Sequence, residues 1–319
     1  MKLDVKDLIA APWTPMNADQ SVNYGAITDY GKVLLKQGVK NVYINGTTGE
    51  GMSLSVEERQ KCAEEWMKTG MDVVMTHVGA NSIADVKALA SHSEKIGCHA
   101  IASLPPIFYK PENLDGLVGY FAEISSAAPN TPLLYYHFVA KSGINFDVIE
   151  LLEKMKKRVP TFAGIKFTDN NLGQVALAID KFGEEMVVGM GLFIVVHLLS
   201  VYGYGKDEQL SAAYMFGVKH SVGSTYSYSG IMWNSVINAA RRGDLAHANK
   251  CQRMQNKMLH TIFSKGFNDG VHKRLLKYIW GFDLGPVRCP ISEPSDEHWR
   301  EIEKRLDAMN YRDFAQGKF

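Results

Sequence analysis

The chain has 319 residues, 46% of them hydrophobic, and a formal net charge of +1 at pH 7. That apolar content is enough for a large core, and the near-neutral charge argues against binding to nucleic acid or to an anionic membrane. The four cysteines form no CxxC pair, and the ten histidines show no metal-ligand spacing, so we expect neither disulfides nor a metal site. Asp4 and Asp7 precede any apolar run, which argues against a secretory signal and favours a cytoplasmic protein.

Short apolar runs alternate with amphipathic stretches along the first three quarters of the chain, as is typical of buried parallel strands and their connecting helices. The strand candidates are residues 8–12, 39–44, 73–79, 100–104, 133–138, 162–167, 186–189 (or a later stretch) and 221–224. Amphipathic stretches such as residues 53–69, 82–96 and 113–127 predict helices between them. Eight strand–helix repeats without a long polar linker predict an α/β fold, the (β/α)8 TIM barrel.

An open doubly wound sheet is the alternative for such repeats, but no GxGxxG fingerprint follows the first strand. After the eighth strand the pattern becomes purely helical, through residues 245–263, 272–280 and 297–309. We therefore divide the chain into a barrel (residues 1–243) that carries the active site and a C-terminal helical extension (residues 244–319). Barrel enzymes carry their chemistry at the carboxyl ends of the strands, so candidate residues should gather there.

The second strand runs into a Gly-Thr-Thr-Gly-Glu sequence at residues 46–50, which we call the threonine turn. Its glycines allow a ligand to approach the backbone closely, and Thr47 and Thr48 offer two adjacent hydroxyl groups that suit a carboxylate. No Gly-Lys-Ser/Thr follows, so it is not a Walker phosphate loop. The plain alternative is a strand-to-helix turn with a helix cap.

The fifth and sixth strands carry the two residues with the clearest chemical potential. Tyr136 ends an apolar run and could relay protons, although an isolated tyrosine there is more often a core aromatic. Lys166 lies inside the apolar strand 162–167, where an ammonium group is costly unless it is paired or deprotonated. A neutral lysine amine condenses with a ketone to form a Schiff base. The alternative is a side chain that reaches solvent from the strand end.

Residues 186–205 contain no Asp, Glu, Lys or Arg, and their length approaches that of a membrane span. Four glycines and the lack of a second such segment favour a buried strand with extra apolar sequence instead. The barrel has room for one seventh strand, which is either residues 186–191 or residues 198–204. We favour the later stretch, because it leads directly into Asp207 and Glu208. Residues 192–196 would then lie in a loop and form an exposed apolar patch.

The threonine turn, Tyr136 and the Gly-Ile-Lys-Phe-Thr sequence at residues 164–168 together resemble the pyruvate-dependent lyase family of N-acetylneuraminate lyase and dihydrodipicolinate synthase. Within that family, the sequences at residues 205–209 and 223–226 are most similar to the animal N-acetylneuraminate lyases. The resemblance extends over most of the chain. It implies a TIM barrel with C-terminal helices, a homotetramer, and a class I aldolase that needs no cofactor because Lys166 forms the covalent imine.

The resemblance also assigns roles to individual residues. Lys166, Tyr136 and Thr47 would be catalytic, and Thr47 and Thr48 would bind the carboxylate of a sugar-acid substrate. The hydroxyl groups of the sugar would be held by a further set of residues. These are Thr168, Gly205, Asp207, Glu208 and Ser224. Carboxylates suit that role because they accept hydroxyl hydrogen bonds, although an acidic pair is also typical of the first turn of a helix.

Three departures from the family pattern keep alternatives open. Lys141 replaces a residue that is usually apolar in sialate lyases and is arginine in the synthase, and Val139 replaces the usual proline. These two positions favour a related aldolase with another aldehyde partner, such as dihydrodipicolinate synthase, whereas the pair Asp207 and Glu208 favours a sialate lyase. About a dozen extra residues near 190–204 leave a third alternative, an inactive homologue that only binds a ligand.

Overall fold

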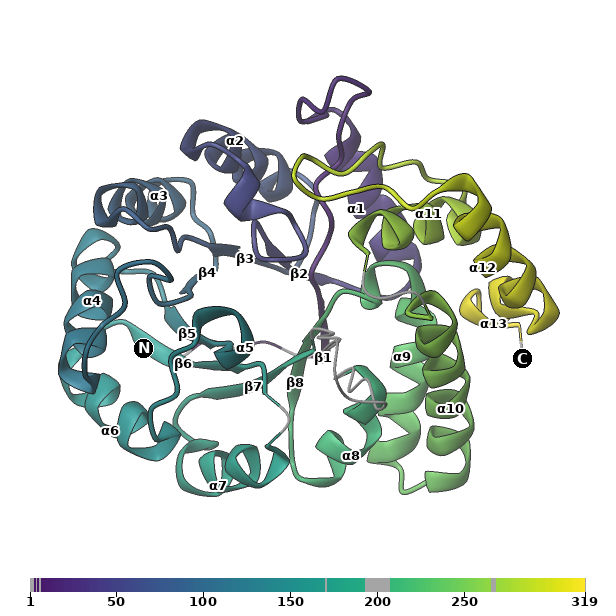
Figure 1. Cartoon of the computed structure of the whole chain (residues 1–319). Helices are drawn as coiled ribbons and strands as arrows, with labels where there is room; N and C mark the ends of the chain where they lie inside the picture. Colours follow the sequence, from purple (N-terminus) through teal and green to yellow (C-terminus); the bar gives the residue numbers. More distant parts are fainter. Residues whose placement is uncertain are drawn as a thin grey trace.

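The computed structural model describes residues 3, 5, 7–169, 171–192, 207–264 and 268–318. Within these residues, eight parallel strands close a barrel in which each strand pairs with its sequence neighbours and β1 pairs with β8. The strands are β1 (Asp7–Ala10), β2 (Asn41–Ile44), β3 (Val73–His77), β4 (Ala100–Ser103), β5 (Leu133–His137), β6 (Phe162–Phe167), β7 (Val187–Leu192) and β8 (His220–Gly223). The predicted TIM barrel is confirmed, and Figure 1 shows it with the strands at the centre of a ring of helices.

The helices of the ring follow the strands in order. They are α1 (Ala26–Lys36), α2 (Val56–Met67), α3 (Ile83–Lys95), α4 (Leu114–Ala127), α6 (Val148–Arg158), α7 (Leu172–Phe182), α8 (Leu210–Met215) and α9 (Tyr226–Arg241). Short elements lie between strands and ring helices along the chain: η1 (Gly51–Ser53), α5 (Val139–Ser142) and η2 (Asp207–Gln209). In Figure 1, α5 lies inside the ring of helices, over the barrel.

The helix starts agree with local sequence signals. Ser55 caps α2 in a capping box with Glu58, and Ser82 and Asn113 accept hydrogen bonds from the third residue beyond them at the starts of α3 and α4. Such caps satisfy backbone N–H groups that have no partner inside the helix. The amphipathic pattern together with these caps therefore explains why the helices predicted near residues 53–69, 82–96 and 113–127 were placed within a few residues of their true bounds.

The C-terminal helices pack against one side of the barrel, as Figure 1 shows. They are α10 (Leu245–Ile262), α11 (Asp269–Trp280), α12 (Asp296–Ala308) and α13 (Tyr311–Ala315). The predicted division at residue 243 falls between α9 and α10. Among the described residues, no helix combines the length and the apolar content that are needed to cross a bilayer.

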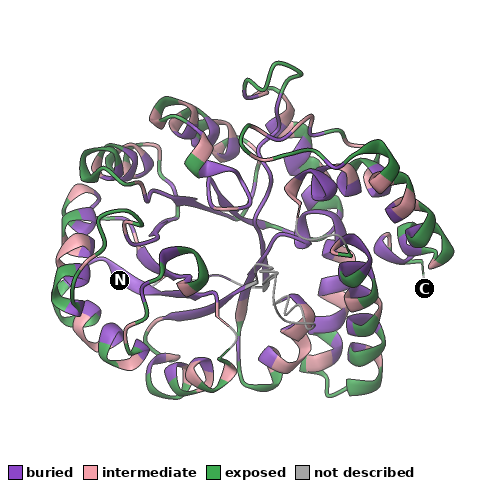
Figure 2. Ribbon diagram, viewed as in Figure 1, coloured by how far each residue is buried: buried purple, intermediate pink, exposed green. Residues whose placement is uncertain are grey.

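The core has two parts because strand side chains alternate between the two faces of the closed sheet. The larger cluster fills the space between the strands and the surrounding helices. The smaller cluster includes Ile9, Tyr43, Met75, Leu134 and Tyr136 and fills the interior of the barrel. Figure 2 shows the strands as buried and the exposed residues on the outer faces of the helices.

The structure corrects the prediction for the seventh strand. The sequence favoured residues 198–204, but β7 is Val187–Leu192 and pairs with both neighbours, with β6 through Gly164 to Phe167 and with β8 through Ser221 to Gly223. Gly191 leaves space for the side chains of Lys166 and Thr168. Pairing with a strand on each side selects residues 187–192 as the seventh strand. Residues 193–206 and the predicted apolar patch that they would carry lie outside the described residues.

Candidate active site

Lys166 lies on the inner face of β6 and is buried, with 6% of its surface exposed. Its Nζ donates a hydrogen bond to Thr168 Oγ1 at 3.2 Å. The same atom lies 3.5 Å from the centroid of the Tyr136 ring and 5.4 Å from that of Tyr43. The side chain therefore lies within the barrel and does not reach solvent from the strand end.

Tyr136 faces Lys166 from the neighbouring strand, since the two residues are register partners in β5 and β6. Its hydroxyl oxygen lies 3.5 Å from Thr47 Oγ1. Burial raises the pKa of Tyr136 to about 12, and its hydrogen bonds with Thr47 and Thr168 oppose that rise. The phenol is therefore protonated near neutral pH and is placed to hand a proton to, or take one from, a group bound next to Lys166.

The threonine turn begins at the end of β2 and brings Thr47 to Tyr136. Asn45 precedes it in a left-handed conformation with φ +58°, and its side-chain amide donates to the carbonyl of Arg59 in α2 at 2.9 Å. Gly51, which follows the turn, must lack a side chain, because a Cβ there would lie 1.8 Å from the carbonyl oxygen of Asn45. Thr48 is buried and Thr47 is half-buried. Close backbone packing thus fixes the two hydroxyl residues at the strand end.

A group of buried side chains from β2, β3 and α2 supports the turn, and sequence reasoning missed it. The rings of Tyr43, His77 and Tyr136 meet edge to face, with centroids 6.0–6.3 Å apart. Arg59 donates to the carbonyl oxygens of His77 at 2.5 Å and Gly79 at 3.0 Å. Burial holds the pKa of His77 well below its usual range, and the charges of Arg59 and Lys166 lower it further, so His77 is neutral.

Gly191 on β7 is a second residue that the sequence analysis did not single out. A Cβ at this position would lie 2.0 Å from Thr168 Oγ1 and 2.7 Å from Lys166 Nζ. Real Cβ atoms do not approach other atoms so closely, so the absence of a side chain is what makes room for the amine. No local sequence signal marks this glycine, because its importance depends on the side chains of the neighbouring strand that it faces.

Comparison with known proteins agrees with this geometry. The model of the dihydrodipicolinate synthetase family matches residues 4–309. The chain belongs to this family. It is 39% identical to N-acetylneuraminate lyase A of Xenopus laevis over 307 residues, which cover 95% of this chain and 96% of the relative. It is 38% identical to the N-acetylneuraminate lyase of Gallus gallus over 313 residues, 97% of each chain. The solved N-acetylneuraminate lyase of Proteus mirabilis superposes with a TM-score of 0.87 at 31% identity, covering 96% of this chain and 99% of that one.

Of the residues that the family resemblance assigned to the sugar, two lie at the carboxyl ends of barrel strands. Thr168 is fully buried directly after β6 and accepts the hydrogen bond of Lys166. Ser224 is buried directly after β8. Gly205 lies outside the described residues. The structure therefore brings Lys166, Tyr136, Thr47 and Thr168 together, with Ser224 on another strand of the same rim.

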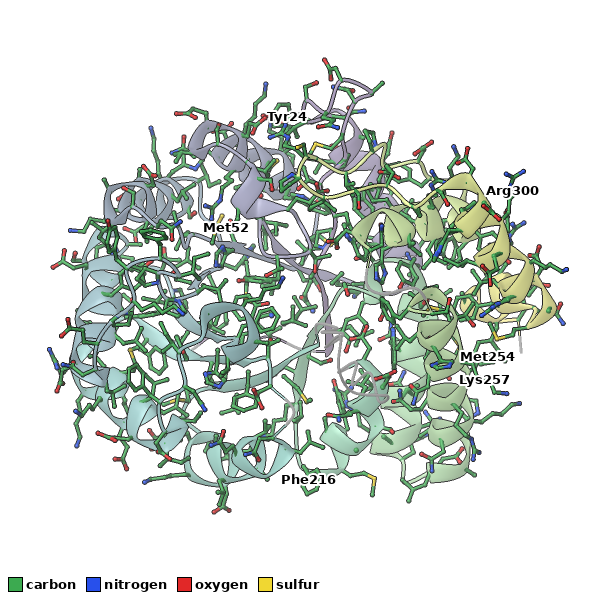
Figure 3. The ribbon with its side chains drawn as sticks, viewed as in Figure 1. Tyr24, Met52, Phe216, Met254, Lys257 and Arg300 are labelled. Atoms are coloured by element: carbon green, nitrogen blue, oxygen red, sulfur yellow. The ribbon has the colours of Figure 1, made fainter. Side chains whose placement is uncertain are left out.

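The described contacts of Asp207 and Glu208 are with α9 and α10. The Asp207 carboxylate is fully buried and accepts a hydrogen bond from Thr225, and Gln252 donates to its carbonyl oxygen at 2.9 Å. Burial raises the pKa of Asp207 to about 7. Glu208 borders an open hollow of about 540 Å³ together with residues of α10 that include Lys257, which is labelled in Figure 3. Their role toward a sugar stays a prediction.

The two family departures, Val139 and Lys141, both lie in α5, directly after the strand that carries Tyr136. Val139 is half-buried and Lys141 is exposed. Burial raises the pKa of Asp269, at the start of α11, to about 6, and the hydrogen bond from Trp13 and the charge of Lys141 oppose that rise. The described residues contain no group of three His, Cys, Asp or Glu side chains that could hold a metal ion.

Proposed function

We propose that this protein is a class I aldolase that reversibly splits N-acetylneuraminate into N-acetylmannosamine and pyruvate. The observation that carries the proposal is the placement of Lys166 Nζ, buried in the barrel, 3.5 Å from the ring of Tyr136 and 3.2 Å from the hydroxyl of Thr168. An amine in such a place is desolvated, which favours its neutral, nucleophilic form. The relatives named above are N-acetylneuraminate lyases, and this supports the choice of substrate.

The proposed reaction begins when the neutral amine of Lys166 attacks the C2 ketone of the open-chain sugar acid. The carbinolamine that forms takes up a proton and loses water, which leaves a protonated imine. The C3–C4 bond then breaks, and its electron pair moves into the imine to give the enamine of pyruvate. The proton of the C4 hydroxyl group must leave at the same time, which releases the aldehyde of N-acetylmannosamine. Protonation of the enamine at C3 and hydrolysis return pyruvate and the free amine.

Tyr136 and Thr47 are proposed to carry the proton of the C4 hydroxyl group. Because the pKa of Tyr136 is about 12, its phenol is not a free base near neutral pH. It acts as a relay, accepting the substrate proton as it hands its own to Thr47, whose oxygen lies 3.5 Å away. Thr47 in turn passes its own hydroxyl proton to the substrate carboxylate bound at the turn. Thr47 and Thr48, with the amides of the threonine turn, bind the carboxylate. The family resemblance adds Thr168, Gly205, Asp207, Glu208 and Ser224 for the sugar hydroxyl groups.

Reductive trapping tests this proposal directly. Purified protein is incubated with pyruvate and sodium borohydride and then weighed by mass spectrometry, with peptide mapping of the adduct. We expect one pyruvate per chain, attached to Lys166, and pyruvate release from N-acetylneuraminate in a coupled assay. A protein that is neither trapped nor active would be the inactive homologue that the extra residues near 190–204 left open.

A dihydrodipicolinate synthase-like activity is the second candidate, and the exposed cation Lys141 in α5 favours it. Both reactions share the imine at Lys166, so trapping does not separate them. The acceptor does: faster condensation of pyruvate with aspartate semialdehyde than with N-acetylmannosamine would select the synthase. We expect the reverse order.

The cellular setting is proposed on the same basis. All four cysteines, which are among the described residues, are free thiols, as is usual in a reducing compartment, and we propose that the enzyme works in the cytoplasm. We propose that it is a homotetramer without a cofactor, as the family resemblance implies, and that residues 1–243 and 244–319 are its barrel and its helical extension. Size-exclusion chromatography with light scattering and activity after chelation test these points.

A further inference from the structure

Glu50 ends the threonine turn and forms a fully buried ion pair with the C-terminal extension. Its carboxylate oxygen Oε1 lies 2.7 Å from Nζ of Lys273 in α11, and the two side chains are 0% and 2% exposed. The residues are more than two hundred positions apart in the sequence. Burial lowers the pKa of Lys273, and the charge of Glu50 opposes that shift. Two charges without access to solvent depend on each other.

The ion pair joins four segments of the chain. Lys273 also donates hydrogen bonds to the carbonyl oxygens of Thr14, after β1, at 2.9 Å and of Pro286, after α11, at 2.6 Å. The second carboxylate oxygen of Glu50 accepts a hydrogen bond from the backbone N–H of Arg288 at 2.7 Å. Thr14 closes the connection, because its hydroxyl group donates to the carbonyl of Gly49 in the turn at 2.6 Å.

The backbone of Glu50 explains why its side chain matters. The residue is left-handed, with φ +55°, a conformation that favours glycine. A glutamate persists there only if the surrounding structure holds it. Its N–H donates to the carbonyl of Thr47 at 3.2 Å, and Thr47 Oγ1 in turn lies 3.5 Å from the hydroxyl of Tyr136. Two contacts, Glu50 to Thr47 and Thr47 to Tyr136, therefore connect the ion pair with the proposed proton relay.

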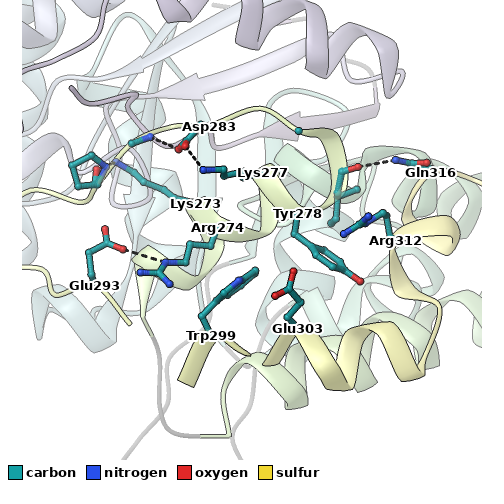
Figure 4. A pocket seen from close by; sticks show the side chains of 14 residues that line it. Lys273, Arg274, Lys277, Tyr278, Asp283, Glu293, Trp299, Glu303, Arg312 and Gln316 are labelled. Carbon is teal, nitrogen blue, oxygen red and sulfur yellow. Dashed lines mark hydrogen bonds and ion pairs between the residues drawn. The ribbon is translucent and has the colours of Figure 1, made fainter. Parts of the chain in front are cut away.

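The three cations of α11 differ in direction, as Figure 4 shows. Arg274 pairs with Glu293 at 3.7 Å, and Lys277 pairs with Asp283 at 2.6 Å, both on the outer side. The three cations border a cavity of about 880 Å³ between α11, α12 and residues 281–293. Lys273 starts from the wall of this cavity, and its Nζ contacts Glu50 and Thr14 of the barrel. Lys277, with a side chain 61% exposed, is thus a matched control for charge on the same helix.

We propose that Lys273 is a positioning residue for the reaction: through its ion pair with Glu50, the C-terminal extension holds the threonine turn so that Thr47 and Thr48 meet the substrate carboxylate. The proposal rests on the proposed function, because it takes the turn as the carboxylate site. It predicts that the extension acts on pyruvate binding, and that Lys166 keeps its own chemistry when the ion pair is lost.

The test compares Lys273→Met, the double variant Glu50→Gln/Lys273→Met, and Lys277→Met as the control. Thermal unfolding reports stability, and borohydride trapping over a range of pyruvate concentrations reports imine formation. Lys273→Met leaves a buried carboxylate without its partner, so its Tm should fall sharply. The double variant carries no buried charge at this place and should recover most of the Tm, which keeps the test valid if the single variant does not fold.

The decisive readout is the pyruvate concentration for half-maximal trapping. In the double variant it should rise about ten- to a hundredfold, because a displacement of the turn by about 1 Å is enough for such a loss. Lys166 should still be trapped at saturating pyruvate, and Lys277→Met should stay within about twofold of wild type. A double variant that regains both Tm and pyruvate affinity would overturn the proposal, since the pair would then only stabilise the fold. Absence of trapping in the wild type would instead reject the proposed function, and with it the inference that rests on it.

Discussion

Substitution of Gly191 by alanine tests the placement of the Lys166 amine with one methyl group. The added Cβ would lie 2.0 Å from Thr168 Oγ1, 2.7 Å from Lys166 Nζ and 3.0 Å from Lys166 Cγ. An ordinary contact needs about 3.5 Å, so Thr168 must move by about 1.5 Å or the strands must separate. Thr168 is fully buried and has a short side chain, so Lys166 loses its hydrogen-bond partner or its position over Tyr136.

The expected effect is much larger on activity than on stability. Overpacking of a core by one methyl group typically lowers the free energy of unfolding by about 1–3 kcal/mol, which a barrel of this size should survive. A displacement of about 1 Å at the reacting group lowers turnover by about a hundredfold. We therefore expect Gly191→Ala to remain folded by circular dichroism, with pyruvate release from N-acetylneuraminate and reductive trapping both slowed by about that factor.

Gly189 provides the control on the same face of β7. A Cβ there would meet its nearest atoms, Ile165 O and Val187 Cγ1, at 3.7 Å, which is ordinary van der Waals contact. Gly189→Ala should therefore retain activity within a few fold of wild type. If Gly191→Ala were as active as Gly189→Ala, the reasoning would be refuted, because β7 would not lie against Lys166 in this register.

Three further predictions concern single residues of the site. Lys166→Ala should abolish both trapping and turnover, and an adduct mapped to Lys141 in the wild type would contradict the assignment. Glu208→Ala should lose activity on N-acetylneuraminate, because sugar hydroxyl groups that lose their acceptor cost about 1–3 kcal/mol of binding free energy. It should still be trapped by pyruvate. Equal loss of activity and trapping would assign Glu208 a structural role. Asp207 has a folded-state pKa of about 7 against an ordinary value of 3.8, so its neutral form is favoured in the fold. Its contribution to stability is full below pH 3.8 and is lost as the pH rises to about 7, by about 4 kcal/mol in all. Asp207→Asn should flatten that decline in urea unfolding at pH 4 to 8, and an unchanged pH profile would mean that the carboxylate is not buried as described.

The strands were predicted well because each one is a short apolar run bounded by polar sequence. β6 was placed at its true bounds, and β2, β3 and β5 within one or two residues at either end. The seventh strand was wrong because the uncharged stretch at residues 186–205 contains two such runs, and local pattern cannot choose between them. The earlier run forms the strand because it pairs with both β6 and β8, and such pairing between distant segments cannot be read from local sequence.

The candidate site divides in the same way. The sequence predicted that Lys166, Tyr136 and Thr47 lie close together, because barrel geometry gathers side chains at the carboxyl ends of the strands, and their proximity is confirmed. Their catalytic roles stay a prediction. Gly191 and Lys273 were missed, because their importance lies in what they touch: one leaves room for an amine on another strand, and the other pairs with a turn that lies far away in the sequence. Contacts of this kind have no local sequence pattern.

The arrangement of the site implies that pyruvate chemistry and acceptor choice can change independently. Lys166, Tyr136 and the threonine turn come from β6, β5 and the end of β2. Gly191 packs closely against Lys166, and the buried ion pair of Glu50 holds the turn. α5, which follows β5 and carries the exposed Lys141, is separate from the elements that hold the amine and the threonine turn. A charge at that position can alter which aldehyde is accepted without moving any atom that forms the imine. The departures from the family pattern at Val139 and Lys141 in α5 are therefore compatible with an unchanged position of Lys166.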